Sequence, residues 1–329
     1  MRAQIIEDFG GVDQFKLVDH PKPAAGPGQV LIKQQASSVN PVDYKIRGGG
    51  REIAPDFPAI LGADISGMVE SVGEDVTGFK PGDAVYGAAA GVKGQGGAYA
   101  EYVVAEARLL AHRPKNLSPL EAAALPLVTI TAWEGLERAG VKAGSTVLVR
   151  GGIGGVGHIV IQLAKAWGAT VTATASNQAK ANKARQLGAD HIINYREQDW
   201  NAAVAEITQG VGFDVVYDAT GGDDLTPAFT ATRLNGQTVA IVGLFKQDLS
   251  ELHARGLSLH LVFMLLPMLA GIGDTDHQAI LNGATTLVEA GQLKPLIDPS
   301  NFTLDTLADA HRHAEDGRPN GKVVISIAE

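Results

Sequence analysis

The glycine-rich stretch "RGGIGGVGHIV" holds the residues whose spacing points most clearly to chemistry. Gly152, Gly154 and Gly157 form a G-x-G-x-x-G pattern, directly after a strand-like segment and directly before a helical one. Glycine allows the backbone to approach a pyrophosphate closely, and the N-terminus of the next helix offers free N–H groups and the positive end of its dipole. A glycine-rich turn without a ligand is the structural alternative, and the flanking pattern argues against it. The loop, which includes Gly155 and Val156, is therefore predicted to bind a dinucleotide.

The segment after the next predicted strand bears on which dinucleotide is bound. An acidic residue about 20 positions beyond the loop would bind the ribose 2′-hydroxyl of NAD, but the segment "TATASNQAK" contains none. Ser176, Asn177 and Lys180 can instead bind a 2′-phosphate. Lys180 could equally be a solvated helix charge, so the missing carboxylate is the stronger observation. We therefore expect the cofactor to be NADPH.

A second group of polar residues lies in "SVNPVDYKIRGGG", residues 38–50. Asn40 precedes a proline, Asp43 and Lys45 lie two apart, and the chain contains no cysteine that could act as a nucleophile or bind a metal. The stretch could be only a turn that leads into a short helix, with Asp43 as its N-cap. It could also be the wall of an active site, where a lysine would donate a hydrogen bond to an oxyanion.

The elements that must position these residues divide the chain into two parts. The first 120 or so residues contain short strands and turns such as "FKPGDAVYG" and "GGAYAEYVVA", which predict an antiparallel, barrel-like domain. A capping box at Ser118 and Glu121 marks a helix start. From Ser145 onward strands and helices alternate, and six strands make a doubly wound parallel sheet, the Rossmann arrangement. The predicted fold class is α/β, with residues 1–122 and 267–329 in one domain and 123–266 in the nucleotide-binding one.

Three further segments lead to expectations about burial and topology. The longest apolar run, Leu259–Gly273, is interrupted by Pro267 and is too short to span a bilayer comfortably, so we expect a buried strand followed by a loop or short helix. The segment "TLADAHRHAEDG" predicts a helix with His311 and His313 on its solvated face. The closing "GKVVISIAE" predicts a strand that returns to the first domain.

Length and composition exclude several classes of protein. A chain of 329 residues exceeds what one core usually serves, which agrees with two domains. The net charge of −9, without Lys/Arg clusters, argues against nucleic acid or an anionic membrane as partner. The absence of cysteine excludes disulfides and fits a reducing compartment. The start "MRAQIIEDFG" does not have the pattern of a signal peptide, so we expect a cytoplasmic protein.

Several motifs together resemble the medium-chain dehydrogenase/reductase superfamily, in its zinc-free quinone oxidoreductase and alkenal reductase branch. Besides the glycine loop, the matching pieces are "NPVDYKIRGG", "LGADISGMVESVG", "GFKPGDAVYG", "GGAYAEYVV", "LPLVTITAWEGL", "GADHIINY" and "NGKVVI". They run nearly from end to end of the chain. The resemblance implies that the first domain is GroES-like and catalytic, and that the protein forms a homodimer, as its relatives commonly do.

The same resemblance implies that no metal is bound. Zinc-dependent members use a cysteine, a histidine of a G-H-E motif and a further ligand, and here Asn40, Ala63 and Leu127 stand at those positions. Without a Lewis acid, hydride transfer to an activated double bond is easier than reduction of a simple ketone. The implied reaction is hydride transfer from NADPH to the β-carbon of an enal, enone or quinone.

The resemblance also assigns site residues. Asn40, Asp43 and Lys45 would line the nicotinamide end, with Lys45 donating to the ribose or to the substrate oxygen and Asp43 orienting Lys45. Many quinone oxidoreductases have a tyrosine where Lys45 stands, whereas Tyr44 falls one residue earlier, which favours the alkenal reductases. Further cofactor positions, some of which could equally be packing residues, are Thr129 and Thr131 at the nicotinamide half, Tyr195 near the 2′-phosphate, Val242, Gly243 and Leu244 after the fifth strand, and Asn320 and Lys322 near the C-terminus.

Two alternatives to an NADPH-dependent reductase remain at this point. One is an alcohol dehydrogenase that works without a metal. The other is a protein that binds NADPH without turnover, as a sensor or scaffold.

Overall fold

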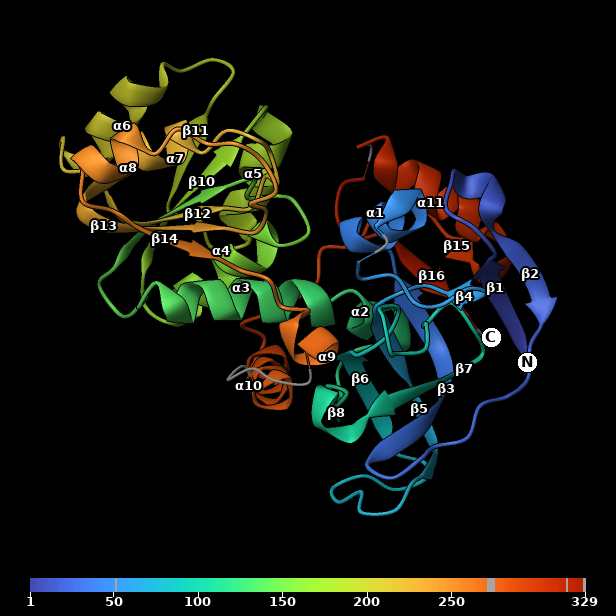
Figure 1. The fold of residues 1–329 in the computed structure, drawn as a ribbon. Coiled ribbons are helices and arrows are strands. Elements are labelled where there is room, and N and C mark those ends of the chain that lie inside the picture. The colour runs from blue at the N-terminus through green and yellow to red at the C-terminus, as the bar shows by residue number, and fades with distance from the viewer. Residues whose placement is uncertain (51, 271–275, 318, 328–329) are drawn as a thin grey trace. The chain divides into compact units, whose positions relative to one another are not determined.

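The computed structural model describes residues 1–50, 52–270, 276–317 and 319–327, which form two compact units (Figure 1). Unit 1 comprises Met1–Leu127, Leu265–Gly291 and Pro295–Glu329, and unit 2 comprises Val128–Met264 and Gln292–Lys294. One unit is built mainly on antiparallel pairing and the other on parallel pairing, so the predicted fold class is confirmed.

Unit 1 contains two sheets. A three-stranded sheet has the order β2-β1-β4, and the larger sheet has the order β15-β16-β3-β5-β6-β8, with β7 also paired to β3. The strands are β1 (Arg2–Ile6), β2 (Lys16–Asp19), β3 (Gln29–Ser38), β4 (Ala59–Ile60), β5 (Asp64–Val72), β6 (Ala84–Ala88), β7 (Tyr102–Glu106), β8 (Leu110–His112), β15 (Phe302–Thr303) and β16 (Val324–Ser326). Strand β16 pairs antiparallel with β3, Val324 opposite Ser38. The C-terminal segment therefore returns to the first domain, as predicted, and lies beside the chain that leads to Asn40.

The helices of unit 1 lie outside these sheets. They are α1 (Pro41–Gly49), α2 (Pro119–Ala123), α9 (Leu266–Ala270), α10 (His277–Glu289) and α11 (Leu307–Glu315), with short 3-10 turns at Val12–Gln14, Ala107–Leu109 and Leu304–Thr306. The predicted capping box of α2 is present, because Ser118 accepts the N–H of Glu121 while the Glu121 carboxylate accepts the N–H of Ser118. Helix α11 packs against α1, the helix formed by "PVDYKIRGG".

Unit 2 is a six-stranded parallel sheet in the order β11-β10-β9-β12-β13-β14, with helices on both faces (Figure 1). The strands are β9 (Thr146–Arg150), β10 (Thr170–Ala175), β11 (His191–Asn194), β12 (Phe213–Asp218), β13 (Thr232–Ala240) and β14 (Ser258–Leu261). The helices are α3 (Pro126–Arg138), which begins at the end of unit 1, α4 (Gly157–Ala166), α5 (Gln178–Gln186), α6 (Trp200–Thr208), α7 (Thr226–Ala231) and α8 (Ser250–Ala254). All six predicted strands form, in the strand order of a dinucleotide-binding fold.

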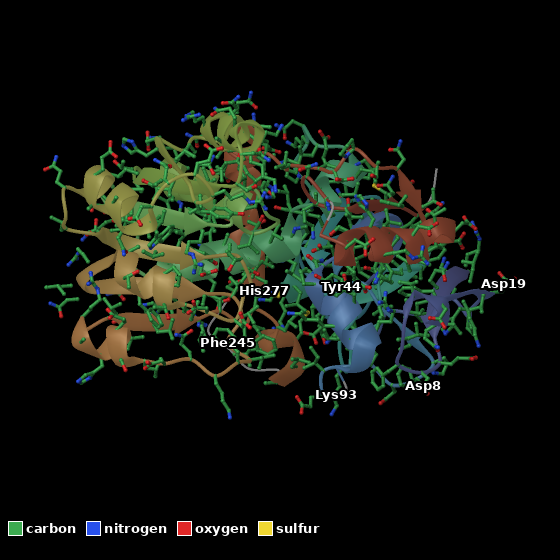
Figure 2. All side chains as sticks on the ribbon, turned by 90° about the horizontal axis from the view of Figure 1, so that it is seen from above. Asp8, Asp19, Tyr44, Lys93, Phe245 and His277 are labelled. Atoms are coloured by element: carbon green, nitrogen blue, oxygen red, sulfur yellow. The ribbon has the colours of Figure 1, made fainter. Side chains whose placement is uncertain are left out.

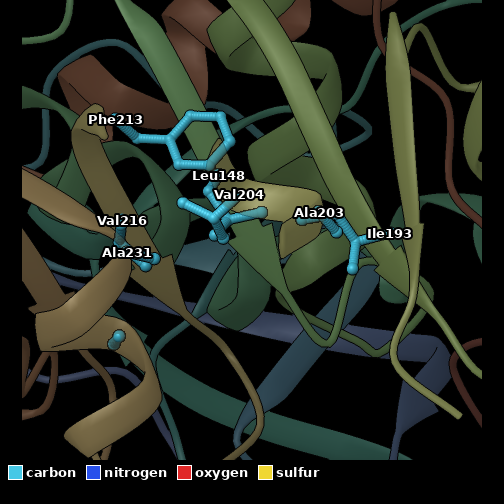
Figure 3. Packing of buried hydrophobic residues seen from close by; sticks show 8 residues of the cluster. Leu148, Ile193, Ala203, Val204, Phe213, Val216 and Ala231 are labelled. Carbon is cyan, nitrogen blue, oxygen red and sulfur yellow. The ribbon is translucent and has the colours of Figure 1, made fainter. Parts of the chain in front are cut away.

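Apolar side chains from strands and helices hold the sheet of unit 2 in place. Figure 3 shows one buried cluster, in which Leu148 of β9, Phe213 of β12 and Val204 of α6 pack together. Burial of one such large side chain contributes about 1.5–3 kcal/mol. The cluster holds the strands whose carboxyl ends carry the loops described below.

The apolar run Leu259–Gly273 was wrongly predicted to begin with a buried strand. Strand β14 is the outermost strand of its sheet, and Leu261 and Phe263 are 48% and 44% exposed. An edge strand has a neighbour on one side only, which leaves its side chains partly open to solvent. The predicted short helix is α9, and the end of the run lies outside the described residues. In the part of the chain that the structure describes, no helix has the length and apolar character needed to cross a membrane.

Candidate functional site

The glycine loop connects β9 to α4 and leaves backbone donors free. The N–H of Gly154 donates to the carbonyl of Gly151 at 2.9 Å, and the N–H of His158 donates to Gly154 at 3.1 Å. The N–H groups of Gly155, Val156 and Gly157 find no acceptor among the described residues. Free N–H groups at the N-terminus of a helix form an anion site. The loop thus has the geometry that a pyrophosphate requires.

The glycines of the loop are needed for different reasons. A Cβ on Gly157 would lie 2.2 Å from the Gly151 carbonyl oxygen, so a side chain is excluded by close packing of the loop on the helix. A Cβ on Gly152 would lie 3.0 Å from Cβ of Ala173. A Cβ on Gly154 would meet only the Gly151 oxygen, at 3.2 Å. Gly157 therefore serves the fold, whereas the contact that limits a side chain at Gly154 is much less severe.

The predicted 2′-phosphate residues gather where β10 and its neighbour β11 end. Asn177 is the N-cap of α5 and accepts the N–H of Lys180 at 2.9 Å. The N–H of Tyr195 donates to the carbonyl of Ala175 at 3.2 Å, and the Tyr195 side chain is 52% exposed. Ser176 and Lys180 are half-buried beside them. The structure thus brings Tyr195, just after β11, next to the segment that carries Ser176, Asn177 and Lys180.

Helix α3 and the loop after β13 hold the remaining candidates of unit 2. The hydroxyl of Thr129 is buried and has no hydrogen-bond partner among the described residues, whereas the Thr131 carbonyl accepts the Tyr217 hydroxyl at 2.7 Å. The Thr131 backbone therefore contributes to packing of α3 on β12. Val242 and Gly243 follow β13, as predicted, and Leu244 beyond them is 95% exposed.

Helix α1 begins differently from the prediction. Asn40, not Asp43, is the N-cap residue, and Pro41 occupies the first helical position. Asp43 lies one turn further on, where its Oδ2 accepts the N–H of Asn40 at 2.7 Å. The prediction of Asp43 as N-cap was wrong, because the carboxylate binds the N–H of the residue that precedes the helix.

A buried cluster of Asn40, Asp64 and Lys322, which we call the lysine cluster, lies at the start of α1. Asn40 Nδ2 donates to Asp64 Oδ2 at 2.7 Å, and Lys322 Nζ donates to Asn40 Oδ1 and, at 3.1 Å, to the Val39 carbonyl. Lys322 Nζ also pairs with Asp64 Oδ2 at 3.6 Å. Burial lowers the pKa of Lys322, while the charges of Asp64 and Asp43 act in the opposite direction. All three side chains are buried.

A chain of hydrogen bonds leads away from the other side of Asp43. The Tyr99 hydroxyl donates to Asp43 Oδ2 at 2.9 Å, and His311 Nε2 lies 3.2 Å from that hydroxyl oxygen. Arg47 donates to His311 Nδ1 at 3.0 Å and pairs with Glu315. Since Nδ1 accepts from Arg47, Nε2 carries the proton and donates to Tyr99. His311 was predicted to be solvated, and this prediction was wrong because the ring is fully buried against α1. His313, the other histidine that was predicted to be solvated, is half-buried, and its Nε2 lies 3.2 Å from Asp298 Oδ1.

Burial shifts the pKa values of two groups in this chain of hydrogen bonds in opposite directions. Desolvation raises the pKa of Asp43 to about 7, although the N–H of Asn40 and the Tyr99 hydroxyl favour its charged form. Desolvation, with a smaller effect of Arg47, lowers the pKa of His311 to about 3. Asp43 Oδ1 has no hydrogen-bond partner among the described residues, which leaves room for a proton there.

The structure separates the four candidate catalytic residues into two kinds. Asn40 and Asp43 are buried, and the polar atoms that they use are bonded to unit 1 itself. Lys45 is exposed and Tyr44, labelled in Figure 2, is half-buried. The bonds of Asp43 go to Asn40 and Tyr99, not to Lys45. Only Tyr44 and Lys45 are thus open to a ligand.

The two C-terminal candidates also differ. Asn320 is exposed, and its N–H donates to Asp298 Oδ2 at 2.8 Å. The ammonium of Lys322 is turned inward, into the lysine cluster. Asp64 was not among the predicted site residues, although it directly follows Ala63, because only the folded chain shows what its carboxylate binds.

The side chains at the three expected metal positions do not form a zinc-binding donor set. Ala63 and Leu127 offer hydrocarbon, and the carboxamide of Asn40 already binds the ammonium of Lys322. Zinc sites in proteins use thiolate, imidazole and carboxylate donors. Within the described ranges, no three His, Asp or Glu side chains come together as a metal would need.

A dinucleotide loop on a Rossmann-type unit, carried by the same chain as an antiparallel unit, defines an NAD(P)H-dependent oxidoreductase. Residues 26–115 match the family described as alcohol dehydrogenase GroES-like domain, and residues 155–266 match the one described as zinc-binding dehydrogenase. The chain belongs to the medium-chain dehydrogenase/reductase superfamily, among relatives that are quinone and alkenal oxidoreductases.

Three similar proteins illustrate this relationship. A 2-methylene-furan-3-one reductase from Solanum lycopersicum is 38% identical over 334 residues, which cover 99% of this chain and 79% of that protein. The chloroplastic NADPH-dependent alkenal/one oxidoreductase from Arabidopsis thaliana is 35% identical with the same coverage. The crystal structure of an alcohol dehydrogenase superfamily protein from Novosphingobium aromaticivorans has a TM-score of 0.94 and 40% identity, with 100% of both chains covered.

Proposed function

We propose that this protein is a zinc-free reductase that uses NADPH to reduce α,β-unsaturated carbonyl compounds or quinones. The observation that carries the proposal is the lysine cluster, in which an ammonium group binds the Asn40 carboxamide where a metal-dependent enzyme would need a ligand. A buried cation beside that position opposes a second cation. The names of the similar plant reductases support an unsaturated carbonyl substrate.

Unit 2 has the features needed to hold the cofactor. The free N–H groups of Gly155, Val156 and Gly157 would bind the pyrophosphate. Ser176 and Lys180 would bind a 2′-phosphate. The end of β10 has no acidic side chain that would repel this phosphate. When bound, NADPH supplies the hydride. Thr129, Thr131, Val242, Gly243 and Leu244 are proposed to lie at its nicotinamide half, and Asn177, Tyr195 and Asn320 near its other groups.

Unit 1 is proposed to be the catalytic domain, with Lys45 as its principal polar group. Hydride addition to the β-carbon leaves negative charge on the carbonyl oxygen, and an ammonium donor stabilises that charge. Lys45 is exposed on α1 and is free to donate to the substrate oxygen or to the cofactor ribose. Tyr44 next to it would contact the substrate. Asn40 and Asp43 are proposed to position α1 without touching the substrate.

We further propose a cytoplasmic homodimer. Strand β14 is the outermost strand of its sheet, and both Leu261 at its end and Phe263 just beyond it are exposed. An edge strand of this kind is a template for pairing with another chain, and a second copy offers the same edge. Light scattering of the purified protein measures its mass, and a mass of one chain at micromolar concentration would contradict the dimer.

The function is tested by mixing the protein with NADPH and a panel of enals, enones and quinones, and following the absorbance of the reduced nicotinamide. We expect consumption with at least one unsaturated acceptor and none with simple ketones. Lys45→Ala should lower turnover by about 10²–10³-fold, as loss of an oxyanion donor does, with the melting temperature unchanged. Lys33→Met, at an exposed position of β3, is the control. Tight NADPH binding without consumption would indicate a sensor instead.

A further inference from the structure

The carboxylate of Asp64 is bound by groups from two segments, residues 38–40 and Leu127. Its Oδ2 accepts Ser38 Oγ at 2.6 Å and Asn40 Nδ2 at 2.7 Å, and its Oδ1 accepts the N–H of Leu127 at 2.9 Å. Asn40 is the N-cap of α1, and Leu127 lies in the first turn of α3. One buried carboxylate therefore holds the starts of the two helices that carry Tyr44, Lys45 and Thr129.

Lys322 completes this arrangement from the C-terminal segment. Its ammonium donates to the Val39 carbonyl and to Asn40 Oδ1, and it balances the charge of Asp64. The Asn40 carboxamide is thereby held at both ends, because its oxygen binds Lys322 and its nitrogen binds Asp64. The carboxamide plane has a single orientation that satisfies both bonds.

Stability alone does not explain the presence of these charges. A buried ion pair costs several kcal/mol of desolvation per ion, and well-packed apolar residues of similar volume are often as stable or more stable. What apolar residues cannot supply is a set of directed hydrogen bonds to Asn40, Val39 and Leu127. The chemistry of the cluster therefore favours a positioning role over a purely stabilising one.

We propose that Lys322 and Asp64 are positioning residues that set the place of Tyr44 and Lys45 by fixing the first turn of α1. The inference rests on the proposed function in so far as Lys45 meets the substrate or the cofactor there. Neither Lys322 nor Asp64 touches a reacting atom in this account. Their effect is expected in turnover more than in cofactor binding.

The test uses Lys322→Met, Asp64→Asn and the double variant, with Lys33→Met as the matched surface control. Lys322→Met leaves an uncompensated buried carboxylate, so both stability and turnover should fall. The double variant removes both charges and should regain the melting temperature. Its kcat should stay about 10- to 100-fold below that of the wild type, because small displacements of site residues cost this much, while KM for NADPH changes little.

Hydrogen exchange measured on the same variants separates this inference from the proposed function. Amides of α1 and of the first turn of α3 should exchange faster in the double variant than in the wild type, and Lys33→Met should leave them unchanged. These differences in exchange rate are expected even if the protein reduces no acceptor. The inference is overturned if the double variant regains wild-type kcat together with its stability, or if exchange in α1 is unaltered.

Discussion

Replacing Asp43 by asparagine should expose a pH dependence of stability that the wild type conceals. Burial raises the pKa of Asp43 from 3.8 to about 7, so between these values the folded protein holds a proton that the unfolded chain has released. Its contribution to stability is present at low pH and is lost as the pH rises through about 7. Burial lowers the pKa of His311 from 6.5 to about 3, so its contribution is present above 6.5 and is lost as the pH falls. The two contributions oppose each other.

The magnitude follows from proton counting. A difference of one bound proton between the folded and unfolded states changes the free energy of unfolding by about 1.4 kcal/mol per pH unit. Between about pH 4 and 6.5 the contributions of Asp43 and His311 have opposite signs and cancel. Asp43→Asn leaves only that of His311, so stability should rise with pH by about 2 kcal/mol between about pH 5 and 6.5. His311→Gln leaves only that of Asp43, so stability should fall with rising pH over the same range.

The assay is urea unfolding of the wild type and both variants at several pH values in this window. Other titrating groups are common to the three proteins and cancel when the curves are subtracted. The two variants should diverge from the wild type with slopes of opposite sign. Three parallel curves would contradict this prediction, because they would mean that neither group has a shifted pKa in the folded protein.

The remaining predictions concern the cofactor loop and the 2′-phosphate. Gly157→Ala should prevent stable folding of unit 2, since its Cβ would lie 2.2 Å from the Gly151 oxygen, whereas Gly154→Ala, with a Cβ 3.2 Å from that oxygen, should lower the melting temperature far less and weaken NADPH binding. Calorimetry of both variants checks this pair, and equal losses of stability would contradict it. Lys180→Ala should raise KM for NADPH by about tenfold, the loss of roughly one charge-assisted hydrogen bond, and leave KM for NADH unchanged. Equal effects on both cofactors would reject a 2′-phosphate role for Lys180.

Unit 2 was predicted well because the sequence pattern that determines each of its strands and helices lies within a short stretch of the chain. Each strand and helix has its own apolar pattern, and the glycine loop follows a strand and precedes a helix within about 20 residues. Strand β14 was the exception, since an apolar run does not reveal whether a strand lies inside a sheet or at its edge. Whether a strand lies inside a sheet or at its edge depends on how all the strands of the sheet pair.

Unit 1 was harder because its site is assembled from distant segments. The lysine cluster joins residues 40, 64 and 322, and no local pattern links them. The burial of His311 did leave a signal, because Leu307, Ala310 and His311 have the i, i+3, i+4 spacing of one helix face. That spacing places His311 on the buried side of α11, where the structure has it.

In the proposed reaction, hydride reaches the β-carbon of an unsaturated carbonyl compound or quinone. It is tested most directly by running the reaction with NADPH that carries deuterium at the transferred position and analysing the product by NMR. We expect a saturated carbonyl product with deuterium on the β-carbon when an enal or enone is supplied. Deuterium on the former carbonyl carbon of an alcohol product would contradict it and indicate an alcohol dehydrogenase.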